Sequence, residues 1–181
     1  MPITLGELAP LEGVKRWAFA EKARRIRIAS AIPGGAIHVS SAWFVVVGDA
    51  VYVPLDPTVG DPGQTTTPDH RHIEIIDAGG AVSALIDEGD EVSNFRAVQL
   101  EGSAEAVHDV DLIDELSDVI AEKYFYVGHP DLEYYFSAGN LAARRWYRIV
   151  ADRVDGWDMR ELPQAPVQDL LSFPDHVLHE S

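Results

Sequence analysis

The segment Arg96–Gly102, which reads Arg-Ala-Val-Gln-Leu-Glu-Gly, restricts the fold more than any other part of the chain. Side chains in a strand alternate between the two faces of a sheet, so Arg96 shares a face with Val98 and Leu100. A cation on an apolar face is costly unless an anion meets it, and we therefore expect a carboxylate or phosphate partner for Arg96. An ordinary salt bridge on a surface or edge strand is the simpler form of that expectation. The alternation continues over Asn94–Val107, which predicts a full antiparallel strand.

Length and composition predict one compact domain. The chain has 181 residues, of which 46% are hydrophobic, and this is enough for a sizeable core. We expect a single domain with an N-terminal helix over residues 1–162, followed by a C-terminal tail over residues 163–181. The absence of cysteine excludes disulfides, thiolate catalysis and cysteine-ligated metal sites.

The net charge of −16 is spread unevenly along the chain. Residues 1–30 carry six basic and three acidic side chains, whereas residues 31–181 carry eight basic and 27 acidic ones. An acidic body repels nucleic acid and anionic lipid, so we expect neither as a partner. No apolar run approaches the roughly 20 residues that span a bilayer, and the first residues lack the apolar core of a secretory signal. These features predict a cytoplasmic protein without a membrane partner.

The first third of the chain predicts a helix followed by a meander of three strands. Apolar residues recur at helical spacing over Val14–Arg25, with basic residues on the other faces. Arg27–Ile32 and Ile37–Val47 are rich in β-branched and aromatic residues, and the Pro-Gly-Gly between them is typical of a hairpin turn. Gly48-Asp49 then separates the second strand from Val51–Val53, so a third strand follows a second tight turn.

The middle of the chain predicts a loop and a buried strand. Asp56–Asp69 consists mainly of Pro, Gly, Thr and Asp, which predicts a long surface loop. His72–Ile76 is either a helical turn or an edge strand. Ala81–Ile86 is apolar nearly throughout, which is typical of a central strand.

A capped helix and two strands are predicted for the last third. Asp109 or Asp111 is placed to cap an amphipathic helix that runs to about residue 124. The segment Tyr124–Tyr135 is crowded with aromatic residues, which either line a pocket or cover the end of a barrel. Arg145–Val150 and Arg153–Met159 predict a final pair of strands.

The order of these elements predicts the fold class. It is mainly β with attached helices, and the strands suit a small antiparallel barrel. An open barrel with exposed apolar strands favours a partner that covers them.

Four segments resemble the FMN-binding split β-barrel superfamily, whose members include the pyridoxamine 5′-phosphate oxidases, the flavin reductases and the deazaflavin (F420)-dependent reductases. Together they lie within residues 15–160. They are Arg27–Ser30, the strand Gly35–Val45 with its His-Val-Ser-Ser-Ala-Trp-Phe run, Arg96–Gly102, and the arginine-rich last strand that leads to Gly156-Trp157. The resemblance implies a fold that is mainly β with attached helices, a six- to seven-stranded antiparallel split β-barrel, and a homodimer with the cofactor at the dimer interface.

The resemblance implies a set of cofactor-binding residues and no protein acid or base, because the cofactor itself carries out hydride transfer. Ser40, Ser41 and Trp43 would contact the ring edge, and Arg71 and His72 the phosphate. Arg96 lies on the strand that matches the family pattern, and Arg145, or its neighbours Arg144 and Arg148, would close the site. No catalytic residue is implied.

Three of the implied positions depart from the oxidases themselves. His72 replaces a lysine, which weakens phosphate attraction because an unperturbed histidine is mostly neutral at pH 7. Ala97 replaces a glutamine that contacts the flavin, and Ser40 replaces an arginine. These departures argue against a pyridoxamine phosphate oxidase proper.

The predicted function is therefore that of an FMN-binding oxidoreductase of the same general type, acting on a small organic substrate. An F420-dependent reductase is the nearest alternative. A non-enzymatic flavin or haem carrier is the alternative from a different class, and the three departures motivate it.

The segment Asp69-His70-Arg71-His72 presents two histidines at a spacing that suits metal binding in an extended chain. The arginine between them repels a cation, and the sequence identifies no third histidine for the site. We therefore predict no metal site.

Overall fold

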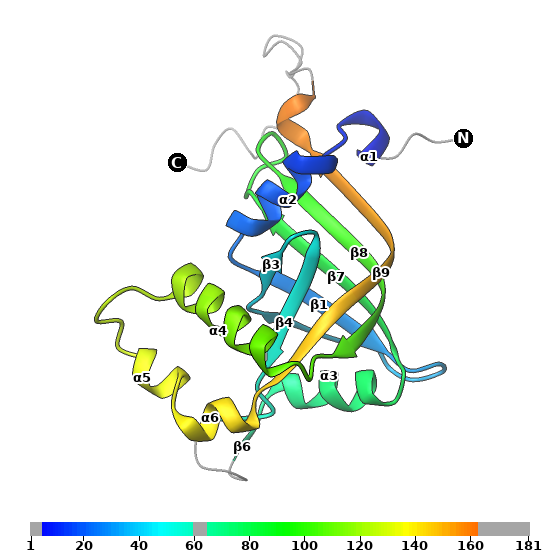
Figure 1. Cartoon of the computed structure of the whole chain (residues 1–181). Coiled ribbons are helices and arrows are strands. Elements are labelled where there is room, and N and C mark those ends of the chain that lie inside the picture. The colour runs from blue at the N-terminus through cyan, green and yellow to red at the C-terminus, as the bar shows by residue number, and fades with distance from the viewer. Residues whose placement is uncertain (1–4, 60–64, 163–181) are drawn as a thin grey trace, which may run out of the picture.

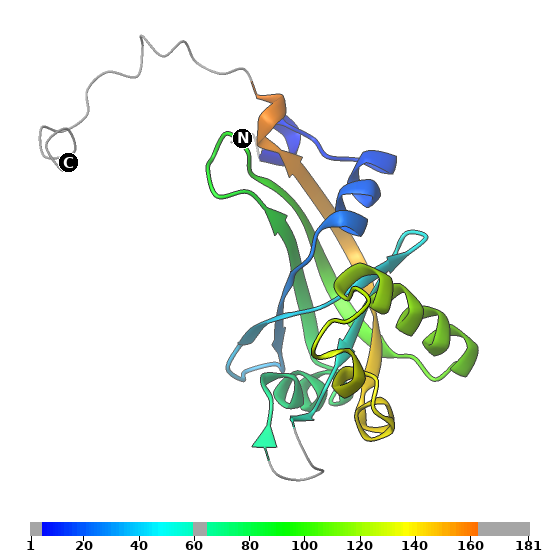
Figure 2. The ribbon, with the colours of Figure 1, turned by 90° about the vertical axis from the view of Figure 1, so that its left-hand side faces the viewer.

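The computed structural model describes residues 5–59 and 65–162 (Figures 1 and 2). The helices are α1 (Leu5–Leu8), α2 (Gly13–Lys22), α3 (Pro68–Asp77), α4 (Val110–Tyr124), α5 (Leu132–Tyr135) and α6 (Ala138–Ala143), and a 3₁₀ helix, η1 (Met159–Glu161), follows the last strand. The strands are β1 (Ile26–Ala31), β2 (His38–Ala42), β3 (Val45–Val47), β4 (Ala50–Leu55), β5 (Thr58–Val59), β6 (Thr65–Thr66), β7 (Ala81–Glu88), β8 (Arg96–Ala106) and β9 (Arg145–Asp158). The predicted tail over residues 163–181 lies outside the described residues.

One curved antiparallel sheet carries the fold (Figure 1). Its seven strands are ordered β2-β1-β7-β8-β9-β4-β3, and β5 and β6 form a separate small hairpin. Every neighbouring pair in the large sheet is antiparallel. The expected class, mainly β with attached helices and a six- to seven-stranded antiparallel split barrel, is confirmed.

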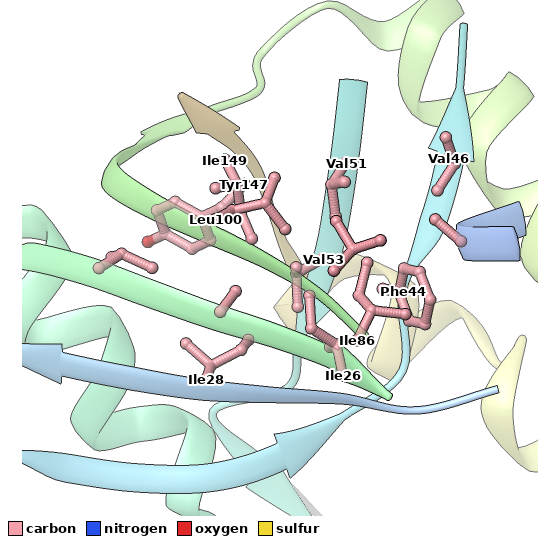
Figure 3. Packing of buried hydrophobic residues seen from close by; sticks show 14 of the residues in the cluster. Ile26, Ile28, Phe44, Val46, Val51, Val53, Ile86, Leu100, Tyr147 and Ile149 are labelled. Atoms are coloured by element: carbon pink, nitrogen blue, oxygen red, sulfur yellow. The ribbon is translucent and has the colours of Figure 1, made fainter. Parts of the chain in front are cut away.

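Alternating side chains on the strands build the main core. Along β1, buried residues alternate with half-buried ones, as expected for a strand with one face toward the core. Strands from both halves of the sheet contribute to the same cluster (Figure 3), which includes Ile26, Ile28, Phe44, Val46, Val51, Val53, Ile86, Leu100, Tyr147 and Ile149.

A second cluster lies under α4. Leu116 and Ile120 of this helix pack with Val45 of β3 and Tyr52 of β4. Because neighbouring residues of β4 point to opposite faces, Tyr52 joins this cluster while Val51 and Val53 join the main core. Both faces of β4 are therefore buried.

The predicted three-strand meander is wrong at one point. The segment Ile37–Val47 is divided at Trp43 into β2 and β3, which lie at opposite edges of the sheet. The cause is a buried tyrosine, because the Tyr124 hydroxyl donates to the Phe44 carbonyl (3.0 Å) and accepts from the Phe44 N–H (3.1 Å). These bonds take the two backbone groups that a continuous strand would pair with a neighbour. The hairpins β1–β2 and β3–β4 on either side are confirmed.

The predicted final pair of strands is one continuous strand. β9 pairs with β8 from Asp158 opposite Arg96 to Tyr147 opposite Ala106, and the register shifts between Glu101 and Gly102. The shift is a β-bulge that lets one strand of 14 residues follow the curvature of the sheet. A Cβ atom on Gly102 would lie 2.1 Å from the Val150 carbonyl oxygen, so only glycine fits here.

The N-terminal segment is fastened to the end of β9. The Leu11 N–H donates to the Gly156 carbonyl (3.0 Å), and the Asp158 N–H donates to the Ala9 carbonyl (2.9 Å). Pro10 forms an isolated antiparallel bridge with Trp157. The two ends of the described chain thus meet on one strand.

Two helices answer questions that the sequence left open. His72–Ile76 belongs to α3, whose N-cap Thr67 accepts the Asp69 N–H, so the predicted loop Asp56–Asp69 already contains the first helical turn. Asp109 is the cap of α4 and accepts the N–H groups two and three residues later. Within the described ranges, no helix has the length and apolar character to cross a membrane.

Replacing Gly102 with alanine should lower the free energy of unfolding by about 2 kcal/mol or more, because backbone atoms would have to move to admit the new methyl group. Urea denaturation followed by circular dichroism measures the change. Gly139→Ala in α6 is the matched control, since no heavy atom lies within 4 Å of the added Cβ. Equal stabilities of the two variants would contradict the steric role of the bulge.

Candidate functional site

A pocket of about 470 Å³ opens where the two halves of the sheet part. Its volume is within the range of small-molecule sites. We call it the tryptophan pocket, and its described lining residues are Arg24, Arg25, Ser41, Ala42, Trp43, Pro54, Asp56, Asp69 and Tyr135.

Aromatic rings form one wall of the tryptophan pocket. Trp43, which is 38% exposed, stacks on Tyr124 with ring centroids 4.8 Å apart and an interplanar angle of 15°. Tyr135 lies 5.0 Å from the same indole in a tilted arrangement. Since Tyr124 also bonds both backbone groups of Phe44, it fixes the chain on which Trp43 stands. Burial raises the pKa of Tyr124 to about 12, so its hydroxyl stays protonated.

Two arginines, Arg24 and Arg25, directly precede β1 and form a basic edge of the tryptophan pocket. Arg24 reaches over the Tyr124 ring, with its Cζ atom 5.2 Å from the ring centroid. Arg25 is exposed and, within the part of the chain that the structure describes, has no hydrogen bond or ion pair. A guanidinium without an internal partner at the mouth of a pocket is available to an anion.

Two carboxylates stand on the α3 side of the pocket. Asp69 accepts the Asp56 N–H (3.1 Å), and the Asp56 carboxylate accepts from Nε (2.8 Å) and Nη2 (3.3 Å) of Arg144. Burial raises the pKa of Asp69, the nearby Asp56 carboxylate raises it further, and the bond from the Asp56 backbone opposes the shift. Asp56 is therefore paired with an arginine, whereas Asp69 accepts a backbone N–H and lies near His38.

The Tyr135 hydroxyl is a buried polar atom without a partner among the described residues. Burial raises its pKa above the ordinary range of tyrosine. The Arg144 guanidinium lies over the Tyr135 ring, with its Cζ atom 3.6 Å from the ring centroid. A buried hydroxyl that makes no hydrogen bond costs free energy, so this group is poised to bond an incoming polar atom.

Behind the pocket, His72 fixes α3 to the first hairpin. The residue is fully buried, and its ring nitrogens bond the hydroxyls of Ser30 (2.8 Å, Nδ1) and Ser40 (2.9 Å, Nε2). Burial lowers the pKa of His72 to about 4, and nearby His38 acts in the same direction. The imidazole is therefore neutral at pH 7, and both of its nitrogens are occupied within the chain.

The structure brings together two of the seven residues that the resemblance implied, Ser41 and Trp43, in the tryptophan pocket. Ser40 and His72 lie in the hydrogen-bond network just described. The part that these four residues would have in cofactor binding stays a prediction.

The other three implied residues lie elsewhere. Arg71 is exposed on α3 and pairs with Glu74 (2.8 Å), and Arg145 lines a different cavity at the start of β9. Arg96 pairs with Glu88 on the neighbouring strand (2.9 Å) and covers the Phe19 ring. The expected anionic partner of Arg96 is therefore a carboxylate of the chain.

Sequence reasoning missed Arg24, Arg25, Asp56, Asp69 and Tyr135 as pocket residues. The predicted first helix, Val14–Arg25, includes both arginines at its end. Helix α2 ends at Lys22 instead, so Arg24 and Arg25 lie in the segment between α2 and β1. The sequence did carry a signal for Tyr135, because lining a pocket is one of the two roles expected for the aromatic segment Tyr124–Tyr135.

The two histidines at positions 70 and 72 do not share a face. They lie on helix α3, where side chains two residues apart point in different directions. The described residues contain no group of three or more His, Asp or Glu side chains arranged to hold a metal ion.

Comparisons with known proteins place the fold. No protein-family model matches the sequence, and no curated protein matches it. A conserved hypothetical protein from Mycobacterium tuberculosis has a TM-score of 0.68 at 21% identity, covering 88% of this chain and 93% of its own. The FAD and heme binding protein from Mycobacterium smegmatis has a TM-score of 0.60 at 13% identity, with 91% and 79% covered. A proposed pyridoxamine 5′-phosphate oxidase from Listeria innocua has a TM-score of 0.52 at 17% identity, with 77% and 93% covered.

These likenesses establish the fold. The chain has the split-barrel architecture of flavin-binding and pyridoxamine 5′-phosphate oxidase-like proteins, as the resemblance of the four segments predicted.

The stability of the chain should fall on acidification through His72. In the unfolded chain its pKa is near 6.5 and in the folded chain about 4, so below pH 6.5 the unfolded state binds the extra proton. The free energy of unfolding should decrease by about 2 kcal/mol between pH 7.5 and pH 5 from this group alone. The contribution is complete above pH 6.5 and is lost as the pH falls toward 4.

Urea denaturation of the wild type and of His72→Gln at both pH values measures this contribution. Glutamine does not titrate, so the variant should lose about 2 kcal/mol less than the wild type between the two pH values. Parallel pH profiles would show that the buried imidazole is not the source.

Proposed function

We propose that the chain binds a flavin or deazaflavin in the tryptophan pocket and acts as an oxidoreductase on a small organic substrate. One observation carries the proposal. Arg25 and the buried Tyr135 hydroxyl, neither of which has a partner within residues 5–59 and 65–162, line the same pocket beside the exposed ring of Trp43. A ligand with a flat ring, ring carbonyls and a phosphate would use all three.

The residues present fit such a ligand in distinct ways. Trp43 offers an aromatic face for the ring system, and offset stacking of rings is favourable. Tyr135 Oη would donate to a ring carbonyl, since its raised pKa keeps the proton on oxygen. Arg25, with Arg24 next to it, would hold the phosphate through charge-assisted bonds.

The carboxylates limit how the ligand can lie. Asp56 and Asp69 repel a phosphate, so that group belongs at the basic edge and the ring toward the α3 side. There Asp56 is paired with Arg144, and burial raises the pKa of Asp69, although the bond from the Asp56 N–H opposes that shift.

A bound flavin supplies hydride transfer, and the protein needs to contribute orientation and exclusion of water. Trp43 and Tyr135 orient the ring. The Tyr124 hydroxyl holds the β2–β3 connection on which Trp43 stands, and the segment that carries Tyr135 covers one side of the pocket. FMN is the cofactor that we propose first, and F420 has the same requirements for a ring wall and an anion site.

The solved structures support binding of this kind. One similar structure is that of a FAD and heme binding protein, and another is that of a proposed pyridoxamine 5′-phosphate oxidase. Among the described lining residues of the tryptophan pocket, Tyr135 is of a type that can hold haem iron, but its raised pKa keeps its hydroxyl protonated and makes it a poor ligand. The pocket therefore favours a flavin over haem.

We also propose that the chain works as a homodimer in the cytoplasm. Ile37, just before edge strand β2, and Val39, within it, are 70% and 60% exposed, and Trp43 follows the end of the same strand. A second copy covering this edge would bury apolar surface and would close the open side of the tryptophan pocket. Size-exclusion chromatography with light scattering should give twice the 19.9 kDa chain mass, and a single-chain mass at micromolar concentration would contradict the dimer.

Titration with FMN and with F420 tests cofactor binding directly. Binding of either at micromolar concentration should quench tryptophan fluorescence, and Arg25→Gln should raise the Kd about tenfold because one charge-assisted phosphate bond is lost. Lys22→Gln, which removes an exposed cation at the end of α2, is the control and should leave Kd unchanged. If neither cofactor binds at micromolar concentration, the proposal is wrong.

A carrier would share the pocket but not the turnover. Asp56 and Asp69, on the α3 side of the pocket, favour the carrier. Without these two carboxylates, a bound cofactor would meet only neutral or basic groups. Reduction of the bound cofactor by NADPH, dithionite or reduced F420, followed by its reoxidation by a substrate panel, distinguishes the two. A flavin that binds but never turns over would identify a carrier.

A further inference from the structure

A second cavity, of about 620 Å³, lies at the opposite side of the Asp56–Arg144 ion pair. We call it the basic cavity. Its described lining residues are Pro57, Thr58, His70, Ile73, Ala106, Val107, His108, Ile113, Ala142, Ala143, Arg144, Arg145 and Trp146. None of them lines the tryptophan pocket.

Basic side chains gather in this cavity although the chain as a whole is acidic. The net charge of the protein is −16, with 30 acidic residues. Two arginines and two histidines line the cavity, and no aspartate or glutamate is among the described lining residues. Such a concentration of basic groups in an acidic chain creates a local site for anions.

Arg144 provides the second and independent observation. Its side chain is 2% exposed, Nε and Nη2 bond Asp56, and Nη2 also donates to the Tyr135 carbonyl (3.1 Å). Its Nη1 atom is buried and has no hydrogen-bond partner within residues 5–59 and 65–162. A buried guanidinium N–H without an acceptor is costly, and an anion in the cavity would remove that cost.

The neighbouring basic side chains make only long contacts. Arg145 is 59% exposed at the side chain, and its Nη1 atom lies 3.6 Å from Asp77, beyond a good hydrogen bond. His70 Nε2 lies 3.5 Å from Glu74. Arg145 is thus free to turn toward an anion that Arg144 already holds.

Apart from Thr58, the rest of the lining is apolar. Ile73 of α3, Ile113 of α4 and Trp146 of β9 contribute hydrophobic surface, and small alanines of α6 leave room beside them. A bare inorganic ion would leave this surface in water. A ligand with an apolar body would bury it and would gain the corresponding transfer free energy.

We propose that the basic cavity binds a small organic carboxylate with a compact apolar body. The carboxylate accepts from Arg144 Nη1 and from Arg145, and the body packs against Ile73, Ile113 and Trp146. The site is separate from the proposed cofactor pocket, and binding there does not require a flavin.

Calorimetric titration of the cofactor-free full chain with hexanoate, hexan-1-ol, hexylamine and inorganic phosphate tests the proposal. Hexanoate should bind saturably, and hexan-1-ol, hexylamine and phosphate should each bind at least about tenfold more weakly, because each lacks either the charge or the apolar body. Absence of saturable hexanoate binding at millimolar concentration would overturn the proposal. Equal binding of hexan-1-ol or of phosphate would overturn it too.

Single-residue variants test whether hexanoate binds in the basic cavity. Arg145→Gln should raise the Kd of hexanoate about tenfold, whereas Arg153→Gln should leave it unchanged, because Arg153 is exposed on the same strand and pairs with Asp155 (2.6 Å). Trp43→Leu should also leave it unchanged. Loss of hexanoate binding in Trp43→Leu, or equal binding by Arg145→Gln and Arg153→Gln, would overturn the assignment to this cavity. Because no flavin is present, failure here leaves the test of the cofactor pocket unaffected.

Discussion

The two hydrogen bonds between Tyr124 and the backbone of Phe44 decide how this chain forms a split sheet. They satisfy the N–H and the carbonyl of Phe44 inside the protein, so the chain can leave strand β2 there without burying unpaired polar groups. β2 then stays at one edge of the sheet and β3 at the other. Trp43 is left at the point of separation, with one ring face on Tyr124. The tryptophan pocket exists because of this break.

Local pattern was sufficient for most of the fold. The alternation over Asn94–Val107, the glycine turns and the cap at Asp109 all correspond to structure that depends on nearby residues. The break at Trp43 could not be predicted in the same way, because its cause is a hydroxyl 80 residues further along the chain. The continuity of β9 also escaped prediction, since the bulge depends on close contact with Gly102 of another strand.

The residues of the tryptophan pocket could be predicted from the sequence only in part, for a related reason. Ser41 and Trp43 follow from the resemblance of one strand, and they do line the pocket. The carboxylate partner of Arg96 was expected in kind, but its identity as Glu88 required the register of β7 against β8. Arg25 and Tyr135 reach the pocket from the segment before β1 and from α5, and no pattern in a single sequence states that these elements meet. Sequence spacing predicts neighbours along an element, whereas a pocket gathers residues across elements.

The bridge between Pro10 and Trp157 bears on how the chain folds as it is made. The backbone groups of Ala9 and Leu11 bond to the last residues of strand β9. The N-terminal segment therefore cannot reach its final partners until that strand has been synthesised. The longest strand pair, β8 with β9, waits for the same residues. Contacts between such distant parts of a chain are slow to form because a large loop must close first. On the ribosome, β1, β2 and β7 can pair early, and they would expose an open edge of β8 until the final strand emerges and closes the sheet.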